Sequence, residues 1–220
     1  MPNRTVALAG ATGLVGRELL RGLLADESVA AVHALVRRPL AMQHAKLVEH
    51  VVDFRALPAL PPIDEVYLAL GTTIKVAGSQ EAFRAVDYEA NLAVARAARA
   101  AGARRAGLVS AMGANARSGV FYNRVKGELE DMLAKEGFDA LVIAQPSLLL
   151  GDRESLGQPA RPVETFMRRA DGVMRHLLPR GVRPIHVHDV AAALLTQVPR
   201  ASGRIVLSSG AMQGAARATR

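Results

Sequence analysis

Residues 5–16 of the chain read TVALAGATGLVG, and helical spacing follows them. The apolar run from Val6 to Ala9 predicts a strand that stops at Gly10. Apolar residues then recur at intervals of three and four through Leu24, which is typical of a helix with one buried face. The stretch therefore predicts a strand, a glycine-rich turn and a helix in immediate succession.

Each glycine of this turn has a physical use. Gly10 permits the sharp bend, Gly13 lets the backbone approach a pyrophosphate, and Gly16 lets the helix pack closely on the strand. The free N–H groups and the dipole of the helix N-terminus would bind the anion. The spacing is Gly-x-x-Gly-x-x-Gly, so an ordinary strand-to-helix connection is the alternative. The predicted cofactor contacts here are Gly10, Thr12, Gly13, Leu14, Val15 and Gly16.

The length and composition predict one well-buried domain. The chain has 220 residues, half of them hydrophobic, and no cysteine, which excludes disulfides and thiolate metal sites. We expect a dinucleotide-binding domain over residues 1–210, with a substrate lid at about 152–184, and a flexible basic tail over 211–220. The apolar residues of the lid segment predict a helix that is either a pocket wall or core.

The amino terminus does not resemble a signal peptide, and no segment is apolar over enough residues to cross a bilayer. We therefore expect a cytoplasmic protein with no membrane association. The net charge of +8 comes from 24 Arg and only 4 Lys. These cations are scattered singly or in pairs among few aromatic residues, which does not favour a nucleic-acid surface.

Short apolar runs alternate with helical patterns along the chain. The strand-like runs are Val32–Val36, Leu47–Val52, Val66–Leu70, Gly107–Ser110, Ala140–Ala144 and Ile205–Leu207. This alternation predicts an α/β fold with a doubly wound parallel sheet, a Rossmann fold. Ligands of such sheets bind beyond the carboxyl ends of the strands, so the functional residues should follow the strands.

Two arginines follow the predicted second strand, where an acidic residue would bind the ribose hydroxyls of NAD. Arg37 and Arg38 could instead clamp a 2′-phosphate with paired, charge-assisted hydrogen bonds. The sequence therefore predicts NADP in preference to NAD. A solvated basic turn is the alternative.

Two further strand ends carry candidate cofactor contacts. Asp53 and Phe54 follow the third strand, where Asp53 could accept a hydrogen bond from the adenine amino group. Residues Leu70, Gly71, Thr72 and Thr73 end the fourth strand, and Gly71 would let the backbone run beside the cofactor. Ordinary loop chemistry, with Asp53 capping a turn, is the alternative.

Ser110, Tyr122 and Lys126 are the predicted catalytic residues. Tyr122 precedes Lys126 by four residues in a helical pattern, so the two share one face of a helix. An ammonium there can lower the pKa of the phenol and bind the nicotinamide ribose, which lets Tyr122 exchange a proton with a substrate oxygen. Ser110, at the end of the fifth strand, could polarise that oxygen. A surface Tyr–Lys pair is the alternative.

Over nearly its whole length, the sequence resembles a short-chain dehydrogenase/reductase of the atypical branch that includes Tat-interacting oxidoreductase-like and NmrA-like proteins. The matching motifs are Gly10–Gly16, Leu70–Thr73, Val86–Tyr88, Leu108–Ala114, Tyr122–Glu130, Gln145–Ser147 and Pro184–Ala191. The resemblance implies a Rossmann fold, the Ser110–Tyr122–Lys126 triad, and a nicotinamide contact from Pro146, Ser147, Leu148 and Leu149.

The chain departs from that family at two positions. Many relatives have paired serines where this chain has Ser110 and Ala111, and a position that often holds a catalytic Asn is Asp87, with Asn91 one turn later. We leave Asp87 and Asn91 out of the predicted catalytic set.

The expected function is NADP-dependent reduction of a small or apolar carbonyl compound, because the lid segment is short for a sugar nucleotide. The alternatives are a redox-sensing regulator that binds NAD(P)H and a protein partner, and a nucleotide-sugar epimerase. A homodimer is compatible with the fold. His186 and His188 alternate along a predicted short strand, but without a third ligand they do not predict a metal site, and Asp189 is placed to cap the next helix.

Overall fold

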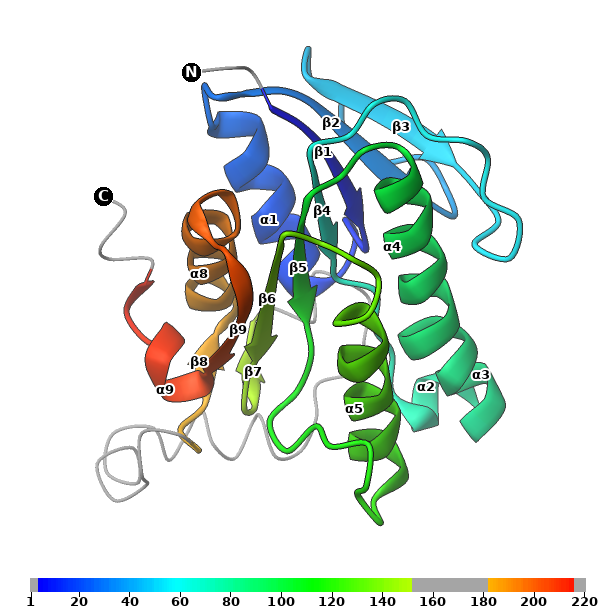
Figure 1. Ribbon diagram of the computed structural model, residues 1–220, viewed down its shortest axis with the longest axis vertical. Helices are drawn as coiled ribbons and strands as arrows, with labels where there is room; N and C mark the ends of the chain where they lie inside the picture. Colours follow the sequence, from blue (N-terminus) through cyan, green and yellow to red (C-terminus); the bar gives the residue numbers. More distant parts are fainter. Residues whose placement is uncertain (1–3, 152–181, 216–220) are drawn as a thin grey trace.

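A computed structural model describes residues 4–151 and 182–215 (Figure 1). Most of the predicted lid, residues 152–181, and the end of the predicted tail, residues 216–220, lie outside these described residues.

The described residues form a seven-stranded, fully parallel sheet with the strand order β3-β2-β1-β4-β5-β6-β9. Its strands are β1 (Arg4–Ala9), β2 (Val29–Val36), β3 (Leu47–Val51), β4 (Glu65–Leu68), β5 (Arg105–Val109), β6 (Ala140–Gln145) and β9 (Gly203–Ser208). The order reverses between β1 and β4, which is the switch point where ligands bind in such sheets. The predicted doubly wound Rossmann fold is confirmed.

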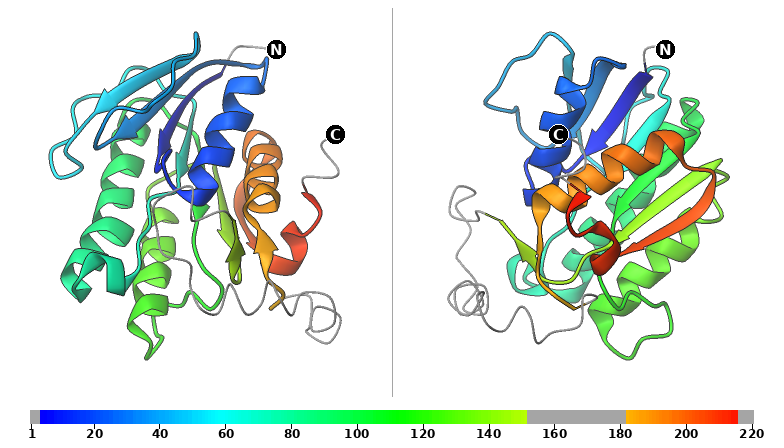
Figure 2. Two further views of the ribbon diagram at one scale, coloured as in Figure 1. Left: turned by 180° about the vertical axis from the view of Figure 1, so that it is seen from behind. Right: turned by 90° about the vertical axis from the view of Figure 1, so that its left-hand side faces the viewer.

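Helices cover both faces of the sheet (Figures 1 and 2). The helices are α1 (Leu14–Ala25), α2 (Ile74–Ala77), α3 (Gln80–Arg84), α4 (Asn91–Ala100), α5 (Phe121–Leu133), α8 (Val187–Gln197) and α9 (Ser209–Met212), with a π-helical segment at Ala85–Ala90 and a 3₁₀ turn at Val198–Arg200. Helices α1 and α8 lie on one face, and α4 and α5 lie on the other.

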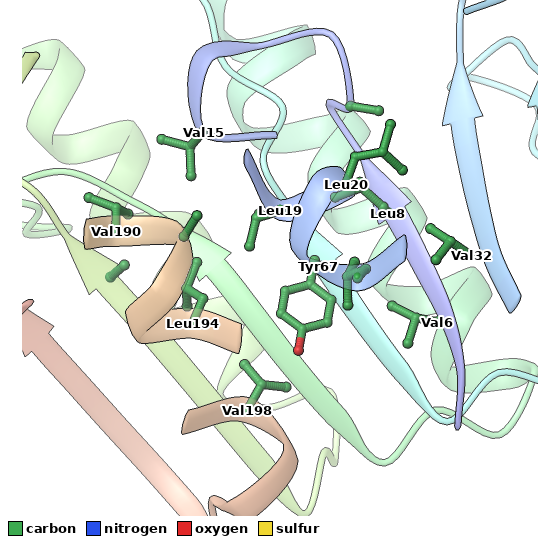
Figure 3. Packing of buried hydrophobic residues seen from close by; sticks show 14 of the residues in the cluster. Val6, Leu8, Val15, Leu19, Leu20, Val32, Tyr67, Val190, Leu194 and Val198 are labelled. Carbon is green, nitrogen blue, oxygen red and sulfur yellow. The ribbon is translucent and has the colours of Figure 1, made fainter. Parts of the chain in front are cut away.

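Two buried clusters hold these layers together. Figure 3 shows the first, in which Leu19 of α1 and Leu194 of α8 meet Val6, Leu8 and Tyr67 of the sheet. The second joins the opposite sides of the same strands to α4 and α5, for example through Leu68, Leu108 and Leu129. Strands buried on both faces explain the continuous apolar runs of the sequence.

Four local expectations differ from the structure. Most of the strands extend one to three residues beyond the predicted runs at one end or both, because hydrogen bonding to a neighbouring strand also recruits polar residues. Strands β3, β4 and β5 end one or two residues before the predicted runs end. A two-residue strand, β8 (Ile185–His186), pairs only with β7 (Leu149–Leu150), so the predicted strand ends before His188, which lies in α8 and contacts Glu18 at 2.7 Å. Asp189 lies inside the first turn of α8 rather than at its N-cap. Met212, placed by sequence in the tail, ends α9 fully buried.

Candidate functional site

The glycine turn joins β1 to α1 at the carboxyl edge of the sheet. Gly10 has a φ of 91°, in the left-handed region, and a β-carbon there would lie 2.3 Å from the carbonyl oxygen of Ala69. A β-carbon on Gly16 would lie 1.9 Å from the carbonyl oxygen of Gly10. The turn therefore packs backbone against backbone, and neither position accepts a side chain.

The N-terminus of α1 fits an anionic group. Its N-cap is Gly13, which offers no side chain to the first N–H groups, and the first turn contains no acidic residue. Gly13 donates to the Gly10 carbonyl at 2.9 Å, which closes the turn. Bare N–H groups and the positive end of the helix dipole are the donor set that a pyrophosphate requires. The residues present thus fit a dinucleotide.

The other predicted contacts of this turn have different surroundings. Thr12 is exposed at the tip of the turn, whereas Val15 is buried in the first core cluster and Leu14 packs against that cluster. Arg37 and Arg38 are exposed directly after β2, and Ala9 of β1 pairs with Leu35 of that strand. The two arginines therefore lie at the same sheet edge as the turn.

Asp53 and Phe54 form a turn after β3. One Asp53 carboxylate oxygen accepts from the Arg55 N–H at 3.0 Å, and the Asp53 carbonyl accepts from Ala56, also at 3.0 Å. Phe54 packs against the second core cluster. These contacts match the alternative of a capped turn, and the cofactor role of both residues stays a prediction.

A cavity of about 370 Å³ opens beside the strand ends. Its described lining residues are Thr72, Thr73, Ile74, Ala111, Met112, Tyr122, Pro146 and Ser147. Five of these were predicted site residues, and they come from two loops and one helix that are far apart in the sequence. No charged side chain is among the described lining residues, so this part of the wall suits a neutral ligand.

Tyr122 lies in the first turn of α5, and Phe83 packs against its ring. Phe83 of α3 is fully buried, and its ring centroid is 5.4 Å from that of Tyr122 and 5.8 Å from that of Phe121. Edge-to-face and tilted aromatic pairs at this separation are favourable contacts. The phenol of Tyr122 is thus held at the pocket wall.

Lys126 is one turn further along α5 and is buried. Its Nζ lies 2.7 Å from a carboxylate oxygen of Asp87, and the two side chains are 5% and 1% exposed. Burial alone would lower the pKa of Lys126, but Asp87, followed by Tyr122, favours the ammonium and raises the pKa above its ordinary value. Lys126 therefore stays protonated beside Tyr122.

Ser110 is buried and is not among the residues that line the cavity. Its hydroxyl donates to Glu130 at 2.5 Å, and Glu130 also accepts from Gln145 at 3.0 and 3.1 Å. The adjacent Ala111 occupies the wall instead. The structure thus brings Tyr122 and Lys126 together with the loop after β4 and leaves the Ser110 hydroxyl engaged elsewhere, so the catalytic role of Ser110 stays a prediction.

The segment after β6 reaches the cavity with its first two residues only. Pro146 and Ser147 line it, whereas Leu149 lies in β7 against the first core cluster, and the Leu148 carbonyl accepts from the Ile185 N–H. In the loop after β4, the Leu70 carbonyl accepts from the Asn91 side chain at 3.1 Å. A β-carbon on Gly71 would lie 3.6 Å from Asp87, an ordinary contact.

Sequence reasoning left out several residues of this site. Ile74, Ala111 and Met112 line the cavity. Beside it, Asp87 pairs with Lys126, and Glu130 accepts a hydrogen bond from Ser110. Glu130 lies four residues after Lys126, a spacing that places both on one helix face. Among the described residues, no cluster of metal-binding side chains was found, and no helix has the length and hydropathy to cross a membrane.

Comparison with known proteins agrees with this geometry. Residues 10–199 match the model of a family described as NAD(P)H-binding. The chain belongs to this NAD(P)H-binding family. It is also 38% identical over 186 residues to "Protein fmp52, mitochondrial" of Emericella nidulans, covering 80% of this chain and 79% of the relative. The predicted membership of a family that binds nicotinamide dinucleotides is thereby confirmed.

Solved structures share the fold. An oxidoreductase of the short-chain dehydrogenase/reductase family from Burkholderia thailandensis has a TM-score of 0.63 at 20% identity, covering 96% of this chain and 94% of its own. MoeE5 in complex with UDP-glucose and NAD has a TM-score of 0.69 at 20% identity, covering 92% and 75%. At such identities the likeness shows the fold alone.

The expectation of a cytoplasmic protein is contradicted by these comparisons. The relative from Emericella nidulans is named as mitochondrial, and so are its namesakes from Aspergillus terreus, Candida albicans and Eremothecium gossypii. The expectation rested on the lack of a recognisable signal peptide, and that lack does not determine the compartment.

Proposed function

We propose that the protein is an NADP-dependent oxidoreductase of the short-chain dehydrogenase/reductase type that reduces a small or apolar carbonyl compound. The observation that carries the proposal is the Tyr122 phenol at the cavity wall, with the buried Lys126 ammonium one helical turn away. A phenol beside an ammonium, at the carboxyl edge of a dinucleotide-binding sheet, is a proton donor positioned for a carbonyl oxygen.

Each part of the site has a task in this reaction. NADPH, when bound, would supply the hydride for the carbonyl carbon. Tyr122 donates its proton to the carbonyl oxygen as negative charge develops there, and the Lys126 ammonium stabilises the phenolate that remains. Thr72 and Thr73 on one side and Pro146 and Ser147 on the other would hold the nicotinamide portion.

The cavity wall supports an apolar substrate. Ile74 and Met112 line the cavity and are 38% and 44% exposed, which is high for large apolar side chains. The described wall has no cation for the diphosphate of a sugar nucleotide, which disfavours the epimerase alternative. Small or apolar aldehydes and ketones are therefore the substrates to screen.

Replacing Tyr122 by phenylalanine tests the reductase proposal directly. Loss of the proton donor should lower kcat by about 100- to 10,000-fold, the usual contribution of general acid catalysis. Phenylalanine keeps the ring that packs on Phe83, so the affinity for NADPH, measured by calorimetry, should change little. A variant that retains its turnover would exclude Tyr122 as the donor.

Replacing Arg37 by alanine tests the preference for NADP. A charge-assisted contact with the 2′-phosphate should be lost, so the ratio of NADPH to NADH affinity should fall roughly tenfold or more. Arg104→Ala is the matched control. Arg104 precedes β5 at the amino ends of the strands, away from the glycine turn, and pairs with Asp139 at 2.6 Å. An unchanged ratio in Arg37→Ala would mean that the arginine is only a solvated turn residue.

A regulator that binds the dinucleotide without reducing a substrate is the second candidate. The observation that favours it is the cavity wall at Ala111, which has no hydroxyl, while the Ser110 hydroxyl donates to Glu130. Tight NADPH binding, together with the absence of NADPH oxidation across a panel of aldehydes and ketones, would support this candidate over the reductase.

A further inference from the structure

The cavity wall needs a second hydrogen-bond donor beside Tyr122. A carbonyl group that is reduced gains negative charge on its oxygen, and donors placed around that oxygen stabilise the charge. Tyr122 supplies one donor at the wall. The Ser110 hydroxyl already donates to Glu130, and Ala111, which lines the wall directly after it, has no hydroxyl. A second donor must therefore come from another part of the wall.

Three further hydroxyl groups belong to the described lining residues, those of Thr72, Thr73 and Ser147. The Ser147 hydroxyl donates to the Arg183 carbonyl oxygen, so its proton is engaged. The Thr73 oxygen accepts from the Val76 N–H at 3.2 Å. This bond uses a lone pair of the oxygen and leaves the hydroxyl proton for another acceptor. Thr73 thus has a hydroxyl whose oxygen is held in place and whose proton is available.

The loop that contains Thr73 is anchored beside the Lys126 ammonium. The Thr72 N–H donates, at 2.8 Å, to the carboxylate that pairs with Lys126. A β-carbon on Gly71 would lie 4.0 Å from the Lys126 Nζ. Tyr122 is one turn before Lys126 on α5 and lines the same cavity as the loop. The Thr73 hydroxyl and the Tyr122 phenol therefore border one binding space.

We propose that Thr73 is a catalytic residue that donates a hydrogen bond to the carbonyl oxygen of the substrate, alongside Tyr122. Its part in reduction rests on the proposed function. A carbonyl that receives a hydride lies against the nicotinamide ring, so a side chain that holds this part of the cofactor also borders the carbonyl. Tyr122 gives up its proton, whereas Thr73 keeps its own and stabilises the developing charge. The ligand is a neutral carbonyl compound, because the described wall contains no charged side chain.

The test is an NMR titration of the NADPH-saturated protein with hexanamide, which requires no turnover. The amide oxygen accepts hydrogen bonds and the amide is not reduced, while the alkyl chain suits the exposed side chains of Ile74 and Met112. Loss of one hydrogen bond between neutral groups should make Thr73→Val bind hexanamide about threefold to tenfold more weakly. Thr73→Ser keeps the hydroxyl and should restore the native affinity to within about twofold.

Ser79→Ala is the matched control. The Ser79 oxygen accepts from the Ala82 N–H at 3.0 Å, as the Thr73 oxygen does from Val76, but Ser79 is not among the described lining residues. This variant loses the same kind of contact with a short helix and should bind hexanamide with native affinity. The proposal is overturned by native affinity in Thr73→Val, by an equal loss in Ser79→Ala, or by a larger loss in Thr72→Val. Failure of the native protein to bind hexanamide would overturn it as well.

Turnover separates this proposal from the proposed function. For any carbonyl compound that the native protein reduces, Thr73→Val should lower kcat by about tenfold or more, and Thr73→Ser should restore it. If the hexanamide affinities behave as expected and no carbonyl compound is reduced, the proposed function fails while Thr73 remains the donor of the cavity. If carbonyl compounds are reduced and Thr73→Val keeps the native kcat and the native hexanamide affinity, the proposed function stands and the role of Thr73 fails.

Discussion

Replacing Gly16 by alanine is expected to abolish dinucleotide binding and to lower the free energy of unfolding by about 3 kcal/mol or more. The new β-carbon would lie 1.9 Å from the Gly10 carbonyl oxygen and 2.6 Å from the Gly10 carbonyl carbon. Both atoms belong to the backbone, so no side chain can rotate away. Helix α1 must shift off the turn, and the N–H groups that would bind the pyrophosphate move with it.

Calorimetry with NADPH measures the loss of dinucleotide binding in Gly16→Ala, and urea denaturation measures its free energy of unfolding. Gly13→Ala is the informative companion, because its β-carbon would lie 3.3 Å from the Gly10 oxygen at a φ of −78°, which alanine adopts readily. We expect that variant to bind NADPH at least tenfold more weakly, a loss of about 1.4 kcal/mol, while it unfolds near the native midpoint. If Gly16→Ala bound NADPH with native affinity, the turn could not be the pyrophosphate site.

Replacing Gly127 by alanine should destabilise the protein by about 2 kcal/mol and abolish reductase turnover, although alanine is the better helix former by about 1 kcal/mol. A β-carbon there would lie 2.2 Å from the Ala116 nitrogen and 2.3 Å from the Asn115 carbonyl carbon. The backbone of that loop crosses α5 at this point, and the Asn115 N–H donates to the Asn123 carbonyl at 3.0 Å. The steric cost thus exceeds the gain in helix propensity, and the displaced helix carries Tyr122 and Lys126.

The sign of the stability change in Gly127→Ala distinguishes a close backbone approach from an ordinary helical glycine. An ordinary helical glycine would give a more stable protein on replacement by alanine, so increased stability of Gly127→Ala in urea denaturation would refute the close approach. Gly119→Ala is the control in the same region, because a β-carbon at Gly119 has no atom within 4 Å. That variant should remain within about 0.5 kcal/mol of the native stability.

Local patterns explain why so much of the fold could be predicted. The glycine turn and the helix after it need only the steric limits of neighbouring residues, and the helical pattern predicted around Tyr122 and Lys126 lies in α5 (Phe121–Leu133). The parallel α/β sheet follows from the alternation of strands and helices. The observed strand ends differ from the predicted ones because the neighbouring strands, which are distant in the chain, determine how far the backbone hydrogen bonds continue.

The sequence by itself determined the Rossmann fold, the glycine turn and the Tyr122–Lys126 pair, because each depends on residues a few positions apart. Only the tertiary structure decided which side chains reach the cavity and which are already engaged. Ser110 looks like its relatives' serine in sequence, yet its hydroxyl donates to Glu130, 20 residues away. Asp87 was set aside, yet it contacts Lys126 across 39 positions (126 − 87). Pairing between buried charges depends on distances across elements, and these exist only once the helices have packed on the sheet.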